Sequence, residues 1–297
     1  MDSYSISDLE KFSGIKAHTI RMWEQRYKAL NPSRSEGNTR YYDGLQLRRL
    51  LNIVSLMNGD FKISELCAMT DEQLNVLLEK ELSNNTSTDY AIEYLISQCI
   101  IAAKEFNEER FDKFFSNALL RFGIKETYLK IIYPSLVRLG IMWAKDSLPP
   151  AQEHFITNLI RQKLHTAIDA LPPPTKPEKL WLLFLLEDEL HETGLLLSQY
   201  LIRNAGHKVI YLGSNVPLVS VEAAVEELNP TELLFFMVRK SDSANDLKTI
   251  DRMKKVFSSL FVYMASSPAR LITLKTSKKF IRLFSVEDLE KQINNHS

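Results

Sequence analysis

Apolar residues recur at helical spacing through the first 170 or so residues of the chain. Short amphipathic runs fill residues 1–82, and longer ones follow in 89–171, with breaks near Asn107, Gly123 and 147–150. Recurrence every three or four residues marks one face of a helix, and the breaks leave room for four helices in the second stretch. The pattern predicts a small helical domain followed by a four-helix bundle.

The period changes after a proline-rich connector at 171–177. Apolar runs of strand length then lie at 180–186, 208–212, 232–238, 261–265 and 280–284. Helix-like segments separate them, around 192–205, 218–228, 246–260 and 286–294. This alternation predicts a Rossmann-like (flavodoxin-like) α/β domain with a parallel sheet covered on both faces. Ligands of such sheets bind at the carboxyl ends of the strands.

Composition adds a local asymmetry of charge to this picture. The 297 residues are 45% hydrophobic and 25% charged, as in folded proteins, and the formal net charge is zero. Between Gly14 and Arg49, however, eight basic residues face three acidic ones. The basic residues are Lys16, Arg21, Arg26, Lys28, Arg34, Arg40, Arg48 and Arg49. A surplus of this kind suits the neutralisation of phosphates.

Several classes of protein are disfavoured by what the sequence lacks. Its two cysteines, Cys67 and Cys99, lie in helix-like apolar patterns, which argues against a disulfide framework or a cysteine zinc site. The start of the chain has no signal-peptide layout, and the longest apolar run is too short to cross a bilayer. No G-x-G-x-x-G follows the first strand, and no phosphate loop is present. We expect a cytoplasmic protein with no membrane partner.

The first 42 residues combine a helix pair with a basic loop. Ser5 and Asp8 are spaced as a capping box, Gly14 ends the first helix, and Ile20 and Trp23 give the second helix an apolar face. Long polar side chains stand at the start of the second helix, namely His18, Thr19 and Arg21. The loop that follows carries Arg34, Asn38, Arg40, Tyr41 and Tyr42, which suit phosphate and minor-groove contacts. A helical domain with a solvated basic face is the plainer interpretation.

The order Y-S-I-S-D-L…G-I…T-I-R-x-W-E-x-R-Y…P-x-R…G-N-T-R-Y-Y resembles the winged helix-turn-helix of the MerR family over roughly residues 4–75. The resemblance implies that the helix pair and wing bind a palindromic operator. It implies DNA contacts by His18, Thr19, Arg21, Arg26, Arg34, Asn38, Arg40, Tyr41 and Tyr42. No long dimerisation helix follows directly, so a dimer and a tetramer both stay open, as does a contact with RNA polymerase or a regulatory protein.

A histidine lies where the first predicted strand ends, in Glu189-Leu190-His191-Glu192-Thr193-Gly194. Taken alone, it is a turn or cap residue. At the carboxyl edge of a parallel sheet, however, a neutral imidazole can reach a metal above the sheet, and a nearby carboxylate can orient its second nitrogen. Gly194 allows a cofactor to approach the backbone closely.

This segment resembles the D-x-H-x-x-G signature of cobalamin-binding domains, with Glu189 in place of the usual Asp, and residues 206–217 match the strand and turn that follow. The resemblance implies that His191 is the lower axial ligand of cobalt. Trp143, followed after nine residues by Glu153 and His154, resembles the helical cap of the CarH/LitR group of light- and cobalamin-responsive MerR-type repressors. In that group the tryptophan shields the upper face of the corrin, which implies adenosylcobalamin. Trp143 as a bundle core residue is the alternative.

The chain departs from the family pattern in its lower tunnel. The family's S-x-L falls on Phe236-Met237-Val238, and its pair of glycines falls on Ala265-Ser266. Phe236 removes a hydrogen bond to the displaced base and adds the volume of a ring, which a packed pocket tolerates poorly. Light-sensing members have a histidine beside the cap tryptophan, where this chain has Ala144, so light-specific switching is not expected.

The resulting prediction has three domains, separated by the polar linker 83–88 and the proline-rich connector. They are a winged helix-turn-helix at 1–82, a helical-bundle cap at 89–171, and a cobalamin-binding-like α/β domain at 178–297. The expected function is a cobalamin-responsive transcriptional repressor with no enzymatic activity. The alternative is the same scaffold with a degenerate cofactor site, switched by a protein partner or another small ligand. A cobalamin-dependent enzyme is disfavoured because the sequence offers no substrate barrel.

Overall fold

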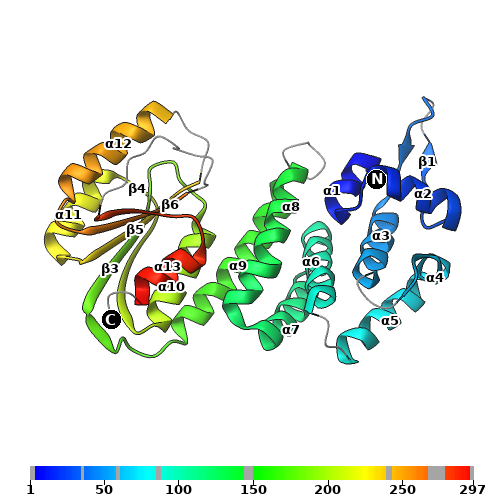
Figure 1. Cartoon of the computed structure of the whole chain (residues 1–297), viewed down its shortest axis with the longest axis horizontal. Coiled ribbons are helices and arrows are strands. Elements are labelled where there is room, and N and C mark those ends of the chain that lie inside the picture. The colour runs from blue at the N-terminus through cyan, green and yellow to red at the C-terminus, as the bar shows by residue number, and fades with distance from the viewer. Residues whose placement is uncertain are drawn as a thin grey trace. The chain divides into compact units, whose positions relative to one another are not determined.

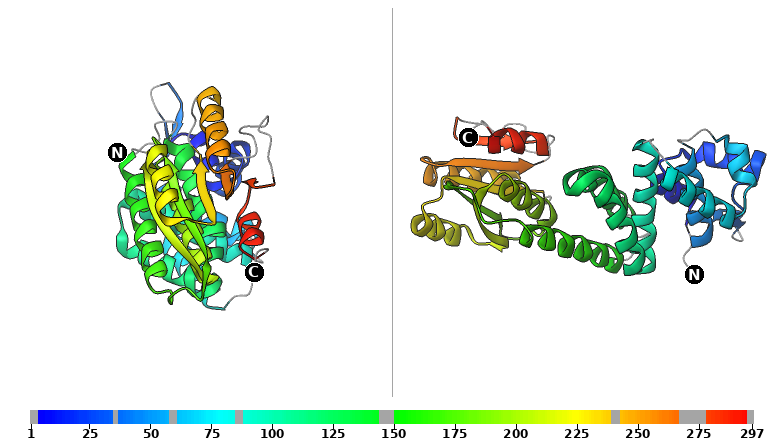
Figure 2. Two further views of the ribbon diagram at one scale, coloured as in Figure 1. Left: turned by 90° about the vertical axis from the view of Figure 1, so that its left-hand side faces the viewer. Right: turned by 90° about the horizontal axis from the view of Figure 1, so that it is seen from below.

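The computed structural model describes residues 4–34, 37–57, 61–84, 88–143, 150–238, 243–266 and 278–294. It divides the chain into two compact units, Met1–Leu159 and Ile160–Ser297 (Figure 1). One unbroken helix, α9 (Pro150–Asp169), contributes residues to both units (Figure 2). No helix in the described ranges is long and apolar enough to span a membrane. The finer division into three domains stays a prediction.

The first unit begins with the predicted helix pair. Helix α1 (Ile6–Ser13) opens with the capping box, in which the Ser5 side chain accepts from the Asp8 amide and the Asp8 carboxylate accepts from the Ser5 amide. Gly14 ends α1 at a positive φ of 73°, a conformation that favours glycine, and α2 (Ala17–Tyr27) follows. Both local predictions are confirmed.

A wing and three further helices complete this region. Strands β1 (Ser33–Arg34) and β2 (Arg40–Tyr41) pair antiparallel and project beyond the helices (Figures 1 and 2). Helices α3 (Gly44–Leu56), α4 (Ile63–Ala68) and α5 (Asp71–Asn84) follow. The architecture is the expected winged helix-turn-helix.

The bundle is built from α6 (Thr88–Glu105), α7 (Glu108–Thr127), a short π-helix η1 (Tyr128–Ile132), α8 (Tyr133–Trp143) and α9. Its breaks lie where the sequence placed them. Asn107 caps α7, Gly123 interrupts the helical backbone with a φ of 70°, and Pro150 opens α9. Because η1 and α8 continue the stretch after Gly123, the four helical segments are those predicted.

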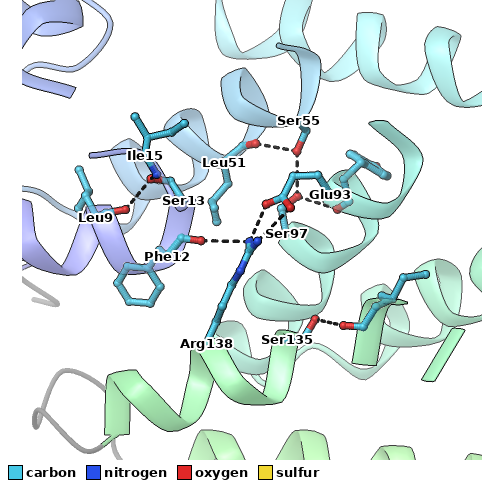
Figure 3. Close-up of polar contacts among 12 residues, drawn as sticks. Leu9, Phe12, Ser13, Ile15, Leu51, Ser55, Glu93, Ser97, Ser135 and Arg138 are labelled. Carbon is cyan, nitrogen blue, oxygen red and sulfur yellow. Dashed lines mark hydrogen bonds and ion pairs between the residues drawn. The ribbon is translucent and has the colours of Figure 1, made fainter. Parts of the chain in front are cut away.

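Polar contacts join α1 and α3 of the winged helix-turn-helix to the bundle inside the first unit. Arg138 on α8 donates to the carbonyl oxygen of Phe12 at the end of α1 (3.3 Å) and to both carboxylate oxygens of Glu93 on α6 (2.5 and 2.9 Å; Figure 3). Buried Ser55 of α3 and Ser97 of α6 are 3.3 Å apart. Helices α1 and α3 are therefore packed on the bundle rather than tethered to it by the linker alone.

The second unit is a five-stranded parallel sheet in the order β4-β3-β5-β6-β7. The strands are β3 (Lys176–Leu186), β4 (His207–Val216), β5 (Glu232–Met237), β6 (Phe261–Ser266) and β7 (Phe280–Leu283). The helices are α10 (Glu192–Asn204), α11 (Leu218–Leu228), α12 (Ser243–Val256) and α13 (Val286–Asn294). The predicted Rossmann-like (flavodoxin-like) α/β domain with a parallel sheet is confirmed. β3 begins inside the predicted connector, because Lys176 already pairs with His207 of β4.

The two faces of the sheet have separate cores. Helices α11 and α12 cover one face and α10 and α13 the other (Figure 1). Alternating side chains such as Leu182, Phe184 and Phe235 pack under α11 and α12. The opposite side chains, Trp181 and Tyr263 among them, are buried on the α10 face, where the two rings stack at 5.2 Å.

Candidate functional site

Helix α2 presents a polar face backed by a buried apolar one. His18, Arg21 and Arg26 are exposed and Thr19 is half-buried, whereas Ile20 and Trp23 are buried. This orientation follows from helical spacing, since residues 20 and 23 share a face. The side chains predicted to contact DNA therefore point away from the core, as a recognition helix requires.

The wing places the next predicted contacts. Arg34 is exposed, and its guanidinium donates to the Asn38 side-chain oxygen at 2.6 Å. Asn38 adopts a positive φ of 60°, which asparagine tolerates better than most residues. Tyr41 is exposed on β2. The wing thus presents a cation, an amide and an aromatic ring, while residues 35–36 lie outside the described residues.

One predicted DNA contact is wrong. Tyr42 is 0% exposed, bridges to Tyr4 through the backbone, and donates its hydroxyl to the carboxylate of buried Glu24. Burial, and then the hydrogen bond to Glu24, raises the pKa of Tyr42 well above its usual value. Tyr42 is a core residue of the module and cannot reach a phosphate from this position.

Two of the basic residues also have structural roles. Arg40 lies 3.3 Å from the Glu24 carboxylate and compensates its buried charge. Arg49 donates to the carbonyl oxygens of Ala29 (2.8 Å), Cys67 (2.8 Å) and Met69 (2.9 Å) and pairs with Asp71 (2.6 Å). The cations that remain exposed in this region are Lys16, Arg21, Arg26, Lys28 and Arg34.

In the second unit, the loop after β3 fixes the predicted histidine. His191 is the N-cap residue of α10, and its Nδ1 lies 2.5 Å from Glu189 Oε1. The other carboxylate oxygen of Glu189 accepts from the Val238 amide at 2.8 Å, and Glu189 is only 2% exposed. The His191 side chain is 61% exposed. A buried carboxylate that holds Nδ1 orients Nε2, across the ring, for an axial bond to a metal.

A second polar group beside this loop was not anticipated from the sequence. Glu192 is buried, forms an ion pair with Arg161 of α9, and accepts from the Tyr211 hydroxyl at 2.9 Å. Burial, and then the hydrogen bond to Glu192, raises the pKa of Tyr211 above its usual value. These contacts lie within the second unit and anchor α10 to α9 and β4.

Phe236 lies directly against Gly194. A Cβ placed on Gly194 would be 2.8 Å from Phe236 Cε1, so the ring occupies the space that the glycine leaves. Ala265 is the neighbour of Phe236 on β6, and both are half-buried. The structure thus brings together Glu189, His191, Gly194, Phe236 and Ala265.

These residues fit one part of a cobalamin and not another. The His191–Glu189 pair has the chemistry of an axial cobalt ligand and its orienting carboxylate. When a protein histidine takes the lower position, the cofactor's nucleotide is displaced and needs room beside that histidine. Phe236 fills the space against Gly194, so the nucleotide does not fit in this arrangement.

The predicted cap residues belong to the first unit. Glu153 accepts from the Thr157 hydroxyl at 2.8 Å, and its second oxygen lies 3.3 Å from Nδ1 of the exposed His154. Trp143 is the last residue of α8, and its side chain, like Ala144, lies outside the described part of the chain. Their contact with a cofactor stays a prediction.

A cavity of about 550 Å³ opens at the carboxyl ends of β3, β4 and β5, as expected for a sheet of this order. Its lining includes Asp188, Asn215, Phe236, Lys248 and Arg252. Glu189 and Phe236, which the sequence motifs marked, line it together with residues of separate turns and of α12 that no motif marked.

Known proteins match both halves of the chain. The MerR HTH family of regulatory proteins matches residues 4–73, and the B12 binding domain family matches residues 95–167. The HTH-type transcriptional repressor CarH of Myxococcus xanthus is 25% identical over 291 residues, which cover 96% of each chain. CarA of the same organism, also an HTH-type transcriptional repressor, is 25% identical over 237 residues, 79% of this chain and 76% of CarA.

The solved structure of the Methanosarcina barkeri monomethylamine corrinoid protein shares the fold, with a TM-score of 0.54 and 13% identity over 74% of this chain and all of that one. The chain is therefore similar to a MerR-type helix-turn-helix over residues 4–73 and to a B12 binding domain over residues 95–167, and it shares its fold with a corrinoid protein, as the sequence motifs indicated.

Proposed function

Since this chain joins a MerR-type helix-turn-helix to a B12-binding-type region and resembles the repressor CarH along nearly its whole length, we propose that it is a DNA-binding transcriptional repressor that senses a corrinoid. The observation that carries the proposal is the pairing, in one chain, of an exposed polar α2 with the oriented His191–Glu189 pair. The role is regulatory rather than enzymatic, and its place is the cytoplasm, where the operator is.

The first half of the proposal concerns operator DNA. Helix α2 enters the major groove with Arg21 toward base edges, and Arg34 on the wing contacts phosphate. Two or four copies of the chain bind a palindromic operator, because a symmetric oligomer matches a symmetric site. RNA polymerase or a regulatory protein is a further partner in this proposal.

Arg21→Ala is expected to weaken binding to a duplex selected from a random library by about tenfold or more and to relax its base preference. Arg34→Ala should instead weaken binding to all sequences alike and lower the salt slope by about one. Fluorescence titrations on selected and scrambled duplexes at several salt concentrations measure both. Lys113→Ala, an exposed change on α7, is the control. The assignment fails if Arg21→Ala and Arg34→Ala behave alike.

The second half concerns the corrinoid. His191 would hold cobalt through Nε2, while Glu189 and the Val238 amide keep the imidazole in place. The resemblance implies adenosylcobalamin, a corrinoid that would supply a cobalt–carbon bond. Trp143, Glu153 and His154 stay the proposed residues of its upper face.

His191→Ala is expected to remove the histidine-ligated absorption spectrum of the bound corrinoid and to weaken binding by about tenfold to a hundredfold. The reason is that the variant has no imidazole at position 191 for Glu189 to orient toward cobalt. Spectra of the full-length protein titrated with cobinamide measure the change. His165→Ala, another exposed histidine, should bind as the unsubstituted protein does. Unchanged spectra in His191→Ala would refute the ligand assignment.

A second candidate is favoured by the ring of Phe236 against Gly194. In it, the same scaffold has lost its corrinoid, and a protein partner or another small ligand switches DNA binding. The cavity beside Asn215 and Arg252 gives such a ligand a place at the carboxyl edge of the sheet. Failure of every corrinoid to bind the folded protein would favour this candidate over the first.

A further inference from the structure

The geometry around Gly194 points to a selectivity that rests on the proposed function and sharpens it. We propose that the His191 site takes corrinoids that lack the lower nucleotide, and that Phe236 is the residue that excludes the nucleotide. Cobinamide is the simplest ligand of this class. The site would then distinguish an incomplete corrinoid from complete cobalamin.

Cobalamin differs from cobinamide in its lower nucleotide. In cobalamin the nucleotide hangs from the lower rim of the corrin ring, on the face from which its base reaches cobalt. If His191 takes that position, the nucleotide must leave cobalt and pass beside the histidine. A corrinoid without a nucleotide needs no space beside the histidine, because its lower face carries only solvent.

Phe236 fills the space beside the histidine. Gly194 lies in the first turn of α10, and its lack of a side chain would offer room for a ligand. Phe236 takes that room, since its Cε1 would be 2.8 Å and its Cδ1 3.4 Å from a Cβ on Gly194. The ring comes from the end of β5, next to the Val238 amide that holds Glu189. A nucleotide and this ring therefore compete for one volume.

A close-packed layer lies beneath Phe236. On the same face of the sheet, Trp181 and Tyr263 are fully buried and stack with an interplanar angle of 20°. Leu183 and Leu234, which are level with Tyr263 in the register and two residues along the strands from the level of Phe236, are 0% exposed. Moving Phe236 inward to admit a nucleotide would require this close-packed layer to open. The buried layer thus keeps the Phe236 ring in the place where it excludes the nucleotide.

The position of the His191 imidazole leaves its ligation of cobalt possible. The His191 imidazole is mostly exposed, and its orientation by Glu189 does not involve Phe236. His191 can therefore still bind cobalt, although the nucleotide is excluded. Complete cobalamin can associate only with its own base on cobalt, or with its nucleotide outside the protein.

The test compares cob(II)inamide with cob(II)alamin on the full-length protein, by absorbance titration and by electron paramagnetic resonance. Cobinamide has no base of its own, so nitrogen splitting in its spectrum must come from the protein and should vanish in His191→Ala. We expect cobinamide to bind at least about tenfold more tightly than cobalamin. Histidine labelled with ¹⁵N should change the cobinamide spectrum and leave the cobalamin spectrum unaltered.

Phe236→Ser should bring the two affinities within about threefold of each other by strengthening cobalamin, because the ring's volume is returned to the ligand. Phe284→Ser, at an exposed phenylalanine of the same unit, should leave the ratio unchanged. If Phe236→Ser does not fold, the ratio of cobinamide to cobalamin affinity in the unsubstituted protein still tests the selectivity. Cobalamin that binds as tightly as cobinamide, with a labelled histidine on cobalt, overturns the selectivity alone. Binding of neither corrinoid overturns both the selectivity and the corrinoid half of the proposed function.

Discussion

Arg49→Ala is expected to lower the free energy of unfolding of the helical unit by about 3 kcal/mol, and to reduce DNA binding only through that loss. The Arg49 side chain is 17% exposed. Its guanidinium forms hydrogen bonds with Ala29 and with the carboxyl end of α4, and an ion pair with Asp71 at the start of α5. Its removal leaves three carbonyl oxygens without their donor. Each buried acceptor left unsatisfied costs about 1–3 kcal/mol, and water entering the gap recovers part of this.

Chemical unfolding of Arg49→Ala, followed by helical circular dichroism, measures the loss. Arg26→Ala is the matched control, because Arg26 is exposed on α2 of the same module and should leave unfolding within about 0.5 kcal/mol of the unsubstituted protein. Arg49→Lys should recover little, since an ammonium lacks the planar fork that reaches several carbonyls at once. A variant that unfolds normally but loses DNA affinity would instead make Arg49 a phosphate contact.

Arg49 also shows why the basic surplus of the sequence overstated the DNA interface. The sequence does not distinguish Arg49 from Arg21. Only the fold brings Arg49 to its carbonyl partners, which lie some twenty residues away in the chain. The prediction for Tyr42 was wrong for the same reason, because its partner Glu24 lies on α2, 18 residues earlier in the chain. Local signals behaved differently. The Ser5 capping box and the Gly14 turn act over three or four residues and were predicted correctly.

The same distinction holds in the second unit. The strands and helices could be predicted because their periods are local, and the His191–Glu189 pair because two residues of one loop must lie close. The volume of Phe236 signalled a filled site, but its contact with Gly194 depends on how β5 lies beside α10. The ion pair of Arg161 with Glu192 had no local signal at all.

Glu232→Gln is expected to raise the free energy of unfolding at pH 8 by up to about 3 kcal/mol. Glu232 lies at the amino end of β5, on the sheet face shared with Trp181 and Tyr263, and is 3% exposed. Burial raises its pKa from the usual 4.5 to about 7, and the nearby Tyr263 hydroxyl and Lys179 ammonium oppose this shift only in part. At 1.36 kcal/mol per unit, a shift of this size corresponds to about 3 kcal/mol.

The sign follows from proton binding. Between pH 4.5 and 7 the folded protein holds a proton on Glu232 that the unfolded chain has lost, so this residue makes stability fall as the pH rises. Above pH 7 the full penalty of a buried carboxylate is present. Glutamine keeps the shape without the charge, so the variant should lack this slope, and the two proteins should converge near pH 4.5. Urea unfolding across this range, with exposed Glu227→Gln as the control, measures the difference. Parallel curves for Glu232→Gln and the unsubstituted protein would show that the carboxylate is solvated, and hence that the layer beneath Phe236 is open to water.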